Sequence, residues 1–285
     1  MNRCRASVLF GASLLAAVPA LAQGARGVQL AISPRQGDTV YMRVEQMLDM
    51  TATTRRNNAD TSMDMHSTML ILSRNIVQAR DEHGATLLII TDSIAMAETG
   101  GGTAPVPDEL RRTLQGKRIR TKLSPQGTWS ILESPDLPAT AAQPFFSPMP
   151  AILPAGPVNV GDAWTQTMTI PIAGQPEGRS AGTIRATFRL DSLARRGELA
   201  YISMRGVVVR DSTDDAQDMP NGYRMTSSGN VSGVMLLDRK RGWLTESRIT
   251  ISVKSVMSRP GDAKATPMRF QIRVTQRMRV EADGW

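Results

Sequence analysis

The sequence offers few residues that could form a catalytic centre. Its 285 residues include two histidines, His66 and His83. A Ser-His-Asp site would need one of them, and we expect both on the surface, His83 in a turn and His66 on the exposed face of a strand. The segment Gly229-Asn-Val-Ser232-Gly233 is not a nucleophile elbow, because its serine is displaced and no strand-turn-helix pattern surrounds it. We therefore expect no catalytic residues and a protein that is not an enzyme.

An acidic cluster and a glycine run are the next candidates for chemistry. The spacing of the clustered aspartates does not fit a calcium-binding loop, so we expect a solvated acidic loop, with an occasional calcium ion left open. The glycines from Gly100 onward lack the Gly-Lys-Ser/Thr of a phosphate loop. We expect no metal site and no cofactor. The aspartates of this cluster are Asp211, Asp214, Asp215 and Asp218.

Methionine is frequent, with 17 in the chain. Met63-Asp-Met65-His66 brings two thioethers and an imidazole together, which are ligands that suit Cu(I). In a strand, however, the two sulfurs share one face while His66 points to the other. The methionines either fill the core or line an adaptable apolar groove. Met63, Met65 and Met69 are accordingly candidate ligand-binding residues.

The N-terminus has the features of a secretory signal. A basic start, an apolar stretch over residues 6–18 and the site Ala20-Leu21-Ala22 predict cleavage before Gln23. Cys4 would be removed with residues 1–22, which excludes disulfides and thiol chemistry in the mature chain. Cys4 precedes the apolar stretch, so lipid anchoring is not supported. No later stretch reaches 18 apolar residues, so we expect an exported protein, periplasmic or secreted, without a transmembrane anchor.

Alternation of apolar and polar residues predicts an all-β fold. Odd positions of residues 61–78 and even positions of residues 268–281 are largely apolar, so each run should bury one face of a strand. One short helix is expected from Pro107, with Gly116 as its cap, and a flexible loop at residues 99–103. Further strands are expected at residues 40–53, 86–97, 118–123, 128–132, 164–172, 183–193, 199–210, 223–237 and 243–256.

Turn sequences suggest two repeated halves. Gly37-Asp38 and Gly161-Asp162 each open a strand, and four expected turns end in glycine, which takes positive φ without a steric clash. Proline density at residues 135–160 predicts an irregular hinge between a first β-rich half, residues 23–134, and a second, residues 161–285. Each half should form an antiparallel meander. We expect a curved sheet or half-barrel type, because long strands in an open sheet twist and curl.

These features resemble a known group of proteins. Val160-Gly161-Asp162-Ala163-Trp164 after a proline-rich hinge, with glycine-ended hairpins and Leu237-Asp238, is similar to an uncharacterised family of exported bacterial proteins. More loosely, it looks like half-barrel carriers of the lipoprotein-localisation type. The resemblance implies a curved sheet whose apolar concavity could hold an acyl chain, and it assigns no functional residue.

Charge suggests a second kind of partner. The chain has a net charge of +8, and the last strand carries a row of arginines opposite its apolar face. This row either faces an envelope protein or an anionic glycan or lipid, or protects an edge strand from pairing with other chains. Aromatic residues make up 4% of the chain, which disfavours nucleic acid as a partner. The row consists of Arg269, Arg273, Arg277 and Arg279.

Large aromatic residues near the hinge complete the candidate site. Phe145 and Phe146 lie within it and Trp164 follows it, and we expect all three to pack at the junction of the halves, at least one lining the concavity. The leading hypothesis is a non-enzymatic exported protein that binds a lipid or another apolar ligand. The alternative is an interaction module that presents the arginine-rich face.

Overall fold

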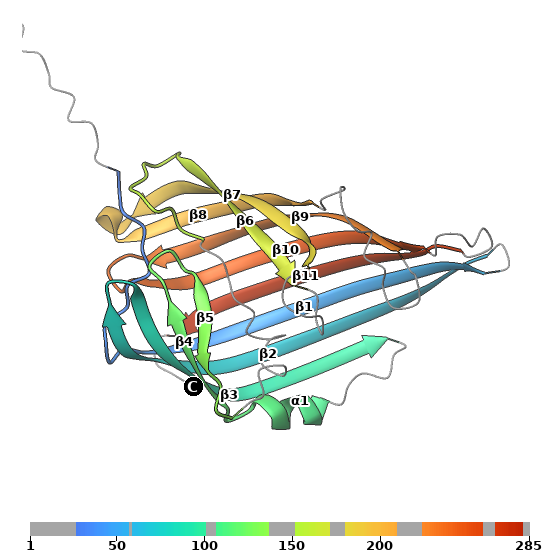
Figure 1. Ribbon diagram of the computed structural model, residues 1–285, viewed down its shortest axis with the longest axis horizontal. Helices are drawn as coiled ribbons and strands as arrows, with labels where there is room; N and C mark the ends of the chain where they lie inside the picture. The colour runs from blue at the N-terminus through green and yellow to red at the C-terminus, as the bar shows by residue number, and fades with distance from the viewer. Residues whose placement is uncertain are drawn as a thin grey trace, which may run out of the picture.

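The computed structural model of the chain describes residues 27–56, 59–100, 107–136, 152–171, 180–209, 224–258 and 266–281. In these residues the protein is almost entirely antiparallel β-sheet, with one short α-helix, as expected (Figure 1). The first meander contains β1 (Thr39–Arg56), β2 (Ala59–Asp81), β3 (Gly84–Gly100), α1 (Pro107–Leu114), β4 (Arg118–Leu123) and β5 (Trp129–Glu133). The second contains β6 (Ala163–Pro171), β7 (Ser180–Ala194), η1 (Arg195–Gly197), β8 (Leu199–Val209), β9 (Arg224–Asp238), β10 (Trp243–Ser258) and β11 (Met268–Glu281).

The two meanders merge into one sheet of 11 strands, in the order β5-β4-β3-β2-β1-β11-β10-β9-β8-β7-β6. The chain enters this sheet near its middle at β1 and runs outward to one edge at β5. It then crosses to the opposite edge at β6 and returns inward, until β11 pairs with β1. The first and last strands therefore join the two halves, and β5 and β6 form the edges.

The predicted alternation is confirmed along the central strands. In β11 the even positions are half-buried from Met268 to Val274, while the arginines between them are exposed. The pattern changes in the middle, where Thr275 is buried and Gln276 is exposed. The expected loop at residues 99–103 is wrong at its start, because β3 continues to Gly100 in register with Met65 of β2.

The four glycine-ended turns have the expected positive φ at the glycine. Gly84, Gly127, Gly197 and Gly242 have φ of 134°, 89°, 88° and 65°, which is the region that favours glycine. The turn η1, Arg195–Gly197, differs from the other three, because Arg195 and Arg196 also have positive φ, of 49° and 57°. These hairpins fix the register of the long strands on either side of them.

The Gly-Asp pairs that open β1 and β6 make the same hydrogen bonds. The Gly37 N–H donates to the Val77 carbonyl in β2, and the Val77 N–H donates to the Asp38 carbonyl, each at 2.9 Å. The repeated sequence thus forms the same local structure at the start of both meanders. In the second meander, the corresponding bonds link Gly161, Leu190 and Asp162 at 2.7 and 3.1 Å.

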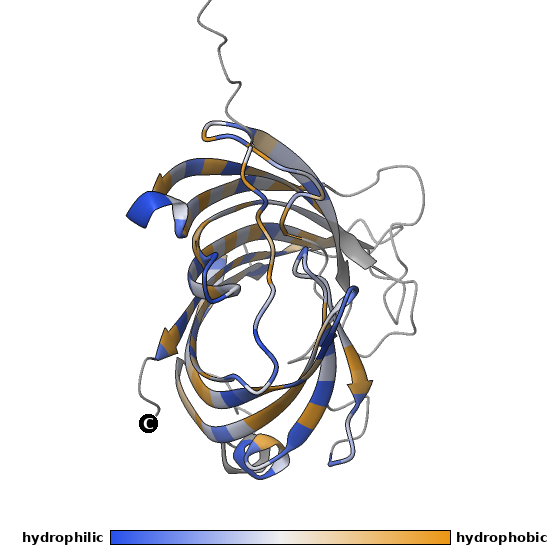
Figure 2. Cartoon of the chain, turned by 90° about the vertical axis from the view of Figure 1, so that its left-hand side faces the viewer, coloured by the Kyte–Doolittle hydropathy of each residue, from blue (hydrophilic) through white to orange (hydrophobic). Residues whose placement is uncertain are grey.

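An N-terminal segment, residues 27–38, closes one end of the sheet. Val28 exchanges two backbone hydrogen bonds with Val158 of the hinge, Ile32 donates to Pro125 and Ser33 donates to Gly242. The segment therefore joins turns from both halves of the sheet. Figure 2 looks at this end and shows the sheet curled around the segment. We call residues 27–38 the N-terminal plug.

The main core lies between the plug and the sheet. Leu30 of the plug is 1% exposed and packs in one apolar cluster with Leu153 of the hinge and with strands from both meanders. A smaller cluster forms where Leu114 of α1 packs against Ile94 of β3 and Ile119 of β4. Burial is thus concentrated at the plugged end of the strands.

Candidate functional site

The sheet has two chemically different faces. We call the face that carries the main core and contacts the plug the inner face, and the opposite one the outer face. Residues directly opposite on paired strands share a face. Val274 of β11 lies opposite both Ile251 of β10 and Leu48 of β1, and this row is on the inner face. Arg273, one residue earlier, lies opposite Ser252 and Asp49 on the outer face.

Away from the plug, the inner face carries an apolar surface that is half-buried or exposed. Met63 is 47% exposed, and its neighbours on β1, β2, β10 and β11 are half-buried. Two members of this surface, Ile251 and Val253, pack against the edge of the main core, whereas the plug covers the inner face at the other end. We call it the open apolar surface, and it consists of Leu48, Met50, Met63, Met65, Ile251, Val253, Phe270, Ile272 and Val274.

The methionines proposed from the sequence lie on the inner face. Met65 is opposite Met50, and Met63 is opposite Ala52, so both belong to the open apolar surface or border it. Met69 is further along β2 and packs against the cluster around Leu114. His66 points to the outer face, opposite Asp49. The alternation that argued against a shared copper site for Met63, Met65 and His66 is therefore present in the structure.

Trp164 connects the hinge to the core. Its Nε1 donates a 2.9 Å hydrogen bond to the carbonyl of Ile152, and its ring packs on Phe188 of β7. Trp164 thus lies at the junction with the hinge, at the plugged end, away from the open apolar surface. Phe145 and Phe146 lie outside the described residues, as do the aspartates between Asp211 and Asp218.

The arginine row occupies the centre of the sheet. Strand β11 lies between β1 and β10, so the explanation of this row as edge protection is wrong. The pattern of charges in the sequence could not show that β11 is a central strand, because its position depends on the pairing of the first strand with the last. Arg269, Arg273, Arg277 and Arg279 are all exposed on the outer face.

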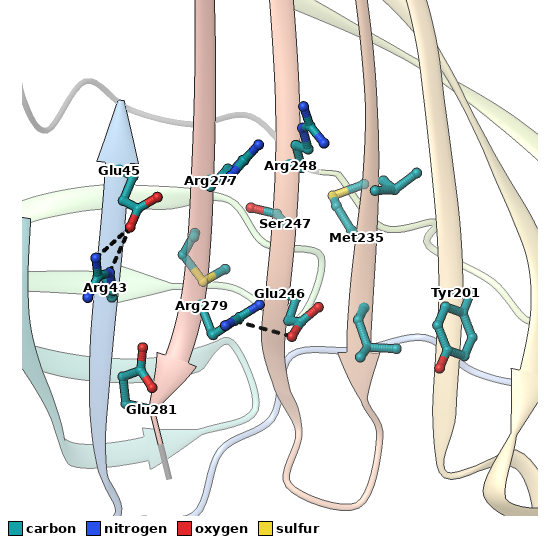
Figure 3. Close-up of a pocket in the computed structure, with 13 residues that line it drawn as sticks. Arg43, Glu45, Tyr201, Met235, Glu246, Ser247, Arg248, Arg277, Arg279 and Glu281 are labelled. Atoms are coloured by element: carbon teal, nitrogen blue, oxygen red, sulfur yellow. Dashed lines mark hydrogen bonds and ion pairs between the residues drawn. The ribbon is translucent and has the colours of Figure 1, made fainter. Parts of the chain in front are cut away.

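A pocket of about 670 Å³ lies on the outer face across β1, β11, β10, β9 and β8 (Figure 3). Arg279 pairs with Glu246 at 3.4 Å, and Arg43 pairs with Glu45 at 2.7 Å. Arg277 of the predicted row also lines the pocket. Arg43, Glu45 and Glu246 were not identified from the sequence, although their alternation within β1 and β10 could have placed them on this face. The remaining charged and large outer-face residues of the lining are Arg248, Glu281, Tyr201, Val234 and Leu236.

A second outer-face pocket, of about 440 Å³, contains an imidazole–carboxylate pair. His66 Nδ1 lies 2.5 Å from Asp49 Oδ1, and Thr51 Oγ1 donates to Asp64 Oδ1 at 2.7 Å. The register of the β1–β2 hairpin places these residues opposite each other. This register could have been inferred from the sequence, because the polar turn after Arg55 determines which residues of β1 and β2 lie opposite each other. The Thr51 hydroxyl bonds to Asp64, so it is not positioned on the imidazole.

Two ion pairs near β4 have a clear electrostatic effect. The ammonium of Lys122, 2.5 Å from Asp81, lowers the pKa of that carboxyl below its ordinary value. The guanidinium of Arg118, 3.0 Å from Asp136, lowers the pKa of Asp136 in the same way. These pairs fasten β4 to the β2–β3 turn and to the segment after β5, so their role is structural.

The described residues contain no group of three or more His, Cys, Asp or Glu side chains arranged to hold a metal ion. Within the same residues, no helix has the length and hydropathy needed to cross a membrane. The features with defined geometry are therefore the open apolar surface on the inner face and the two pockets on the outer face.

Comparisons with known proteins agree with the expected resemblance. Residues 140–244 match a family of unknown function, DUF6263. No curated protein matches the sequence at a significant level. The match includes Val160–Trp164, Leu237-Asp238 and most of the hinge, but not the hairpins that end at Gly84 and Gly127.

Three similar solved structures are distant in sequence and in fold. A lipovitellin structure, described by its lipid–protein interactions, has a TM-score of 0.45 at 10% identity and covers 87% of this chain, which spans 25% of the lipovitellin chain. The outer membrane protein OprG from Pseudomonas aeruginosa has a TM-score of 0.24 at 8% identity, with 86% and 97% coverage of the two chains. An outer membrane lipoprotein-sorting protein domain from Vibrio parahaemolyticus has a TM-score of 0.16 at 10% identity, with 84% and 86% coverage. With TM-scores below 0.5, these likenesses carry no functional argument.

Proposed function

We propose that this protein is a non-enzymatic, exported envelope protein that binds an apolar or amphipathic ligand on its concave inner face. The observation that carries the proposal is the open apolar surface. Strands from both meanders contribute to it in one row, in which Met50 lies between Met65 and Ile272 and Val253 follows Ile272, and all four side chains are half-buried. Large contiguous apolar patches that reach the surface mark ligand-binding grooves or sites of interaction with proteins or membranes.

The physical basis is the transfer of hydrocarbon out of water. An acyl chain gains about 0.8 kcal/mol for each methylene that it buries. The plug and the hinge close one end of the inner face, so a chain lying along the strands would have a closed end at the plug and an open end beyond Met63. The two methionines of β2 in this surface are unbranched and can adjust to ligands of different shape.

The non-enzymatic part of the proposal is supported by the poverty of reactive groups. His83 lies in a turn beside Glu82, and Ser232 is exposed on the outer face. His66 has a carboxylate partner, but the nearby Thr51 hydroxyl is bonded elsewhere. Ester, peptide and glycoside substrates should therefore remain unchanged by the purified protein. Turnover that disappears in His66→Ala, His83→Ala or Ser232→Ala would contradict this part.

A neutral fluorescent probe tests the ligand site directly. N-phenylnaphthylamine has no acidic group, so its binding reports apolar surface without contribution from the arginines. We expect delipidated full-length protein to bind it and to enhance its fluorescence. Val253→Asp should weaken this binding at least tenfold, because a carboxylate on the open apolar surface must lose its hydration when the probe binds.

The matched control uses the neighbouring residue of the same strand. Ser252 points to the outer face opposite Arg273, so Ser252→Asp adds the same charge without entering the apolar surface. Both variants should still unfold cooperatively, with Val253→Asp less stable than Ser252→Asp because Val253 packs against the edge of the main core, so binding is compared at a temperature at which both are folded. Equal probe binding by Val253→Asp and Ser252→Asp would show that the ligand does not use this surface.

A further inference from the structure

Two arginines in the centre of the outer face have no described counter-charge. Arg248 of β10 and Arg277 of β11 lie directly opposite each other. Among the described residues neither forms an ion pair, whereas their neighbours Arg43 and Arg279 are paired with Glu45 and Glu246. Glu45 is opposite Arg277, but its carboxylate bonds to Arg43 at 2.8 Å.

This arrangement has an energetic cost. Like charges directly opposite on paired strands destabilise a sheet. The cost is not explained by protection of an edge, because β10 and β11 are central strands. An anion that bridges the two guanidinium groups would remove the repulsion.

The two arginines lie in the larger outer-face pocket, with apolar side chains beside them. Figure 3 shows Arg277 and Arg248 on adjacent strands, with Tyr201 on a strand further along. Tyr201 is 43% exposed and Val234 is 57% exposed, and Val234 is directly opposite Arg248. The pocket therefore combines a cationic part with an apolar rim.

The charged residues that line the larger outer-face pocket indicate which kind of anion could bind there. A carboxylate holds its two oxygens in one plane and suits the two parallel donors of one guanidinium, whereas the two non-bridging oxygens of a phosphodiester diverge from a tetrahedral phosphorus and can each accept from a different arginine. The lining also contains Glu45, Glu246 and Glu281, so its positive charge is largely balanced. A phosphodiester, which carries one negative charge, fits this balance better than a polyanion does.

We propose that Arg248 and Arg277 form a binding site for a phosphodiester whose apolar body rests on Tyr201 and Val234. This site is separate from the open apolar surface and does not depend on a ligand there. The chemistry is shared by phospholipid headgroups and by free phosphate diesters. The apolar rim favours the lipid, because a free diester has no group to place on it.

Calorimetric titration with two soluble probes tests the site and its ligand. Dihexanoyl phosphatidylglycerol, below its micelle concentration, carries the phosphodiester on an apolar body. Dimethyl phosphate carries the same charge without that body. We expect the lipid to bind at least tenfold more tightly than dimethyl phosphate. If the two probes bind with equal affinity, and Arg248→Gln/Arg277→Gln abolishes the binding of both, the phosphate site is retained. The proposed role of Tyr201 and Val234 is then overturned.

Matched variants separate the site from general attraction by the basic surface. Arg248→Gln/Arg277→Gln should weaken lipid binding at least tenfold and make the remaining binding less dependent on salt. The control Arg185→Gln/Arg205→Gln removes the same charge from exposed outer-face positions on β7 and β8 outside this pocket, and should change affinity less than twofold. An equal loss in both double variants, or no binding of either probe, would overturn the proposal.

The inner-face variant distinguishes this proposal from the apolar ligand site. Val253→Asp should leave the affinity for dihexanoyl phosphatidylglycerol within twofold of wild type, while Arg248→Gln/Arg277→Gln should leave N-phenylnaphthylamine binding unchanged. Loss of phosphatidylglycerol binding in Val253→Asp, with no effect of the arginine changes, would place the lipid on the inner face and contradict the outer site.

Discussion

The rings of Trp164 and Phe188 stack across the β6–β7 pair, with centroids 5.9 Å apart and planes inclined by 10°. Phe188 is completely buried, and Trp164 also bonds to the Ile152 carbonyl of the hinge. The edge strand, the core and the hinge therefore meet at this ring pair. The contact fixes the place where the second meander begins.

Removing the indole ring of Trp164 should destabilise the fold. Trp164→Ala removes the stacked ring and the bond to Ile152, and we expect a loss of about 3 kcal/mol in the free energy of unfolding, at the low end for Trp→Ala because Trp164 is half-buried. Trp164→Phe keeps a stacked ring and should lose about 1 kcal/mol from the missing hydrogen bond. Urea denaturation measures both. Similar losses in the two variants would show that the stacked ring contributes little.

The turn at Gly242 should not tolerate a side chain. Its φ is 65°, and a Cβ there would lie 2.2 Å from the carbonyl oxygen of Ser33 in the plug. Gly242→Ala should therefore lower the melting temperature and loosen the N-terminal plug. Gly156→Ala is the matched control, because no heavy atom lies within 4 Å of its Cβ position. Unchanged protease sensitivity of residues 27–38 in Gly242→Ala would contradict the close packing of this contact.

Acid should weaken the ion pair between Asp136 and Arg118. The pKa of Asp136 is lowered in the folded protein, so the pair stabilises the fold above the unfolded pKa of about 3.9 and loses this effect as the pH falls through the folded pKa. Asp136→Asn should lower the melting temperature at neutral pH, and its difference from wild type should shrink below about pH 4. A difference that stays constant across this range would show that the substitution acts through something other than charge. Asp60→Asn, at the exposed 3.5 Å pair with Arg55, should have a smaller effect.

If the protein is exported, its N-terminal signal should be removed. The Ala20-Leu21-Ala22 site should be cleaved, so that protein from the host envelope begins at Gln23. Intact-mass analysis and N-terminal sequencing measure this. A retained Met1 or a lipidated Cys4 would contradict processing at this site.

The strands and their inward faces could be predicted from the sequence because they depend on local patterns. Alternation along residues 268–281 identified the apolar and arginine-bearing faces, and glycine-ended turns identified the hairpins. The turns at Gly37 and Gly161 were matched because each is a Gly-Asp pair that precedes an expected strand. In the structure the two turns make the same hydrogen bonds. Strand length was underestimated at Gly100, because glycine and threonine alone do not show that a partner strand continues beside them.

The arrangement of the sheet could not be predicted in the same way. Pairing of β1 with β11 joins residues more than two hundred positions apart, and no local pattern encodes it. The plug was missed as well, although Val28, Leu30 and Ile32 alternate with polar or small residues before Pro34. Within the described residues, the lack of an ion-pair partner for Arg248 and Arg277 depends on the register of four strands, and therefore on the whole topology.

Native mass spectrometry of the full-length protein purified from its host can detect a ligand bound to the open apolar surface. Wild-type protein should carry additional mass from an apolar or amphipathic molecule, which organic solvent extracts. Val253→Asp, folded to the same extent, should carry much less of it, while Ser252→Asp should retain it. Wild-type protein without bound mass, or equal loading of the Val253→Asp variant, would contradict ligand binding on the open apolar surface.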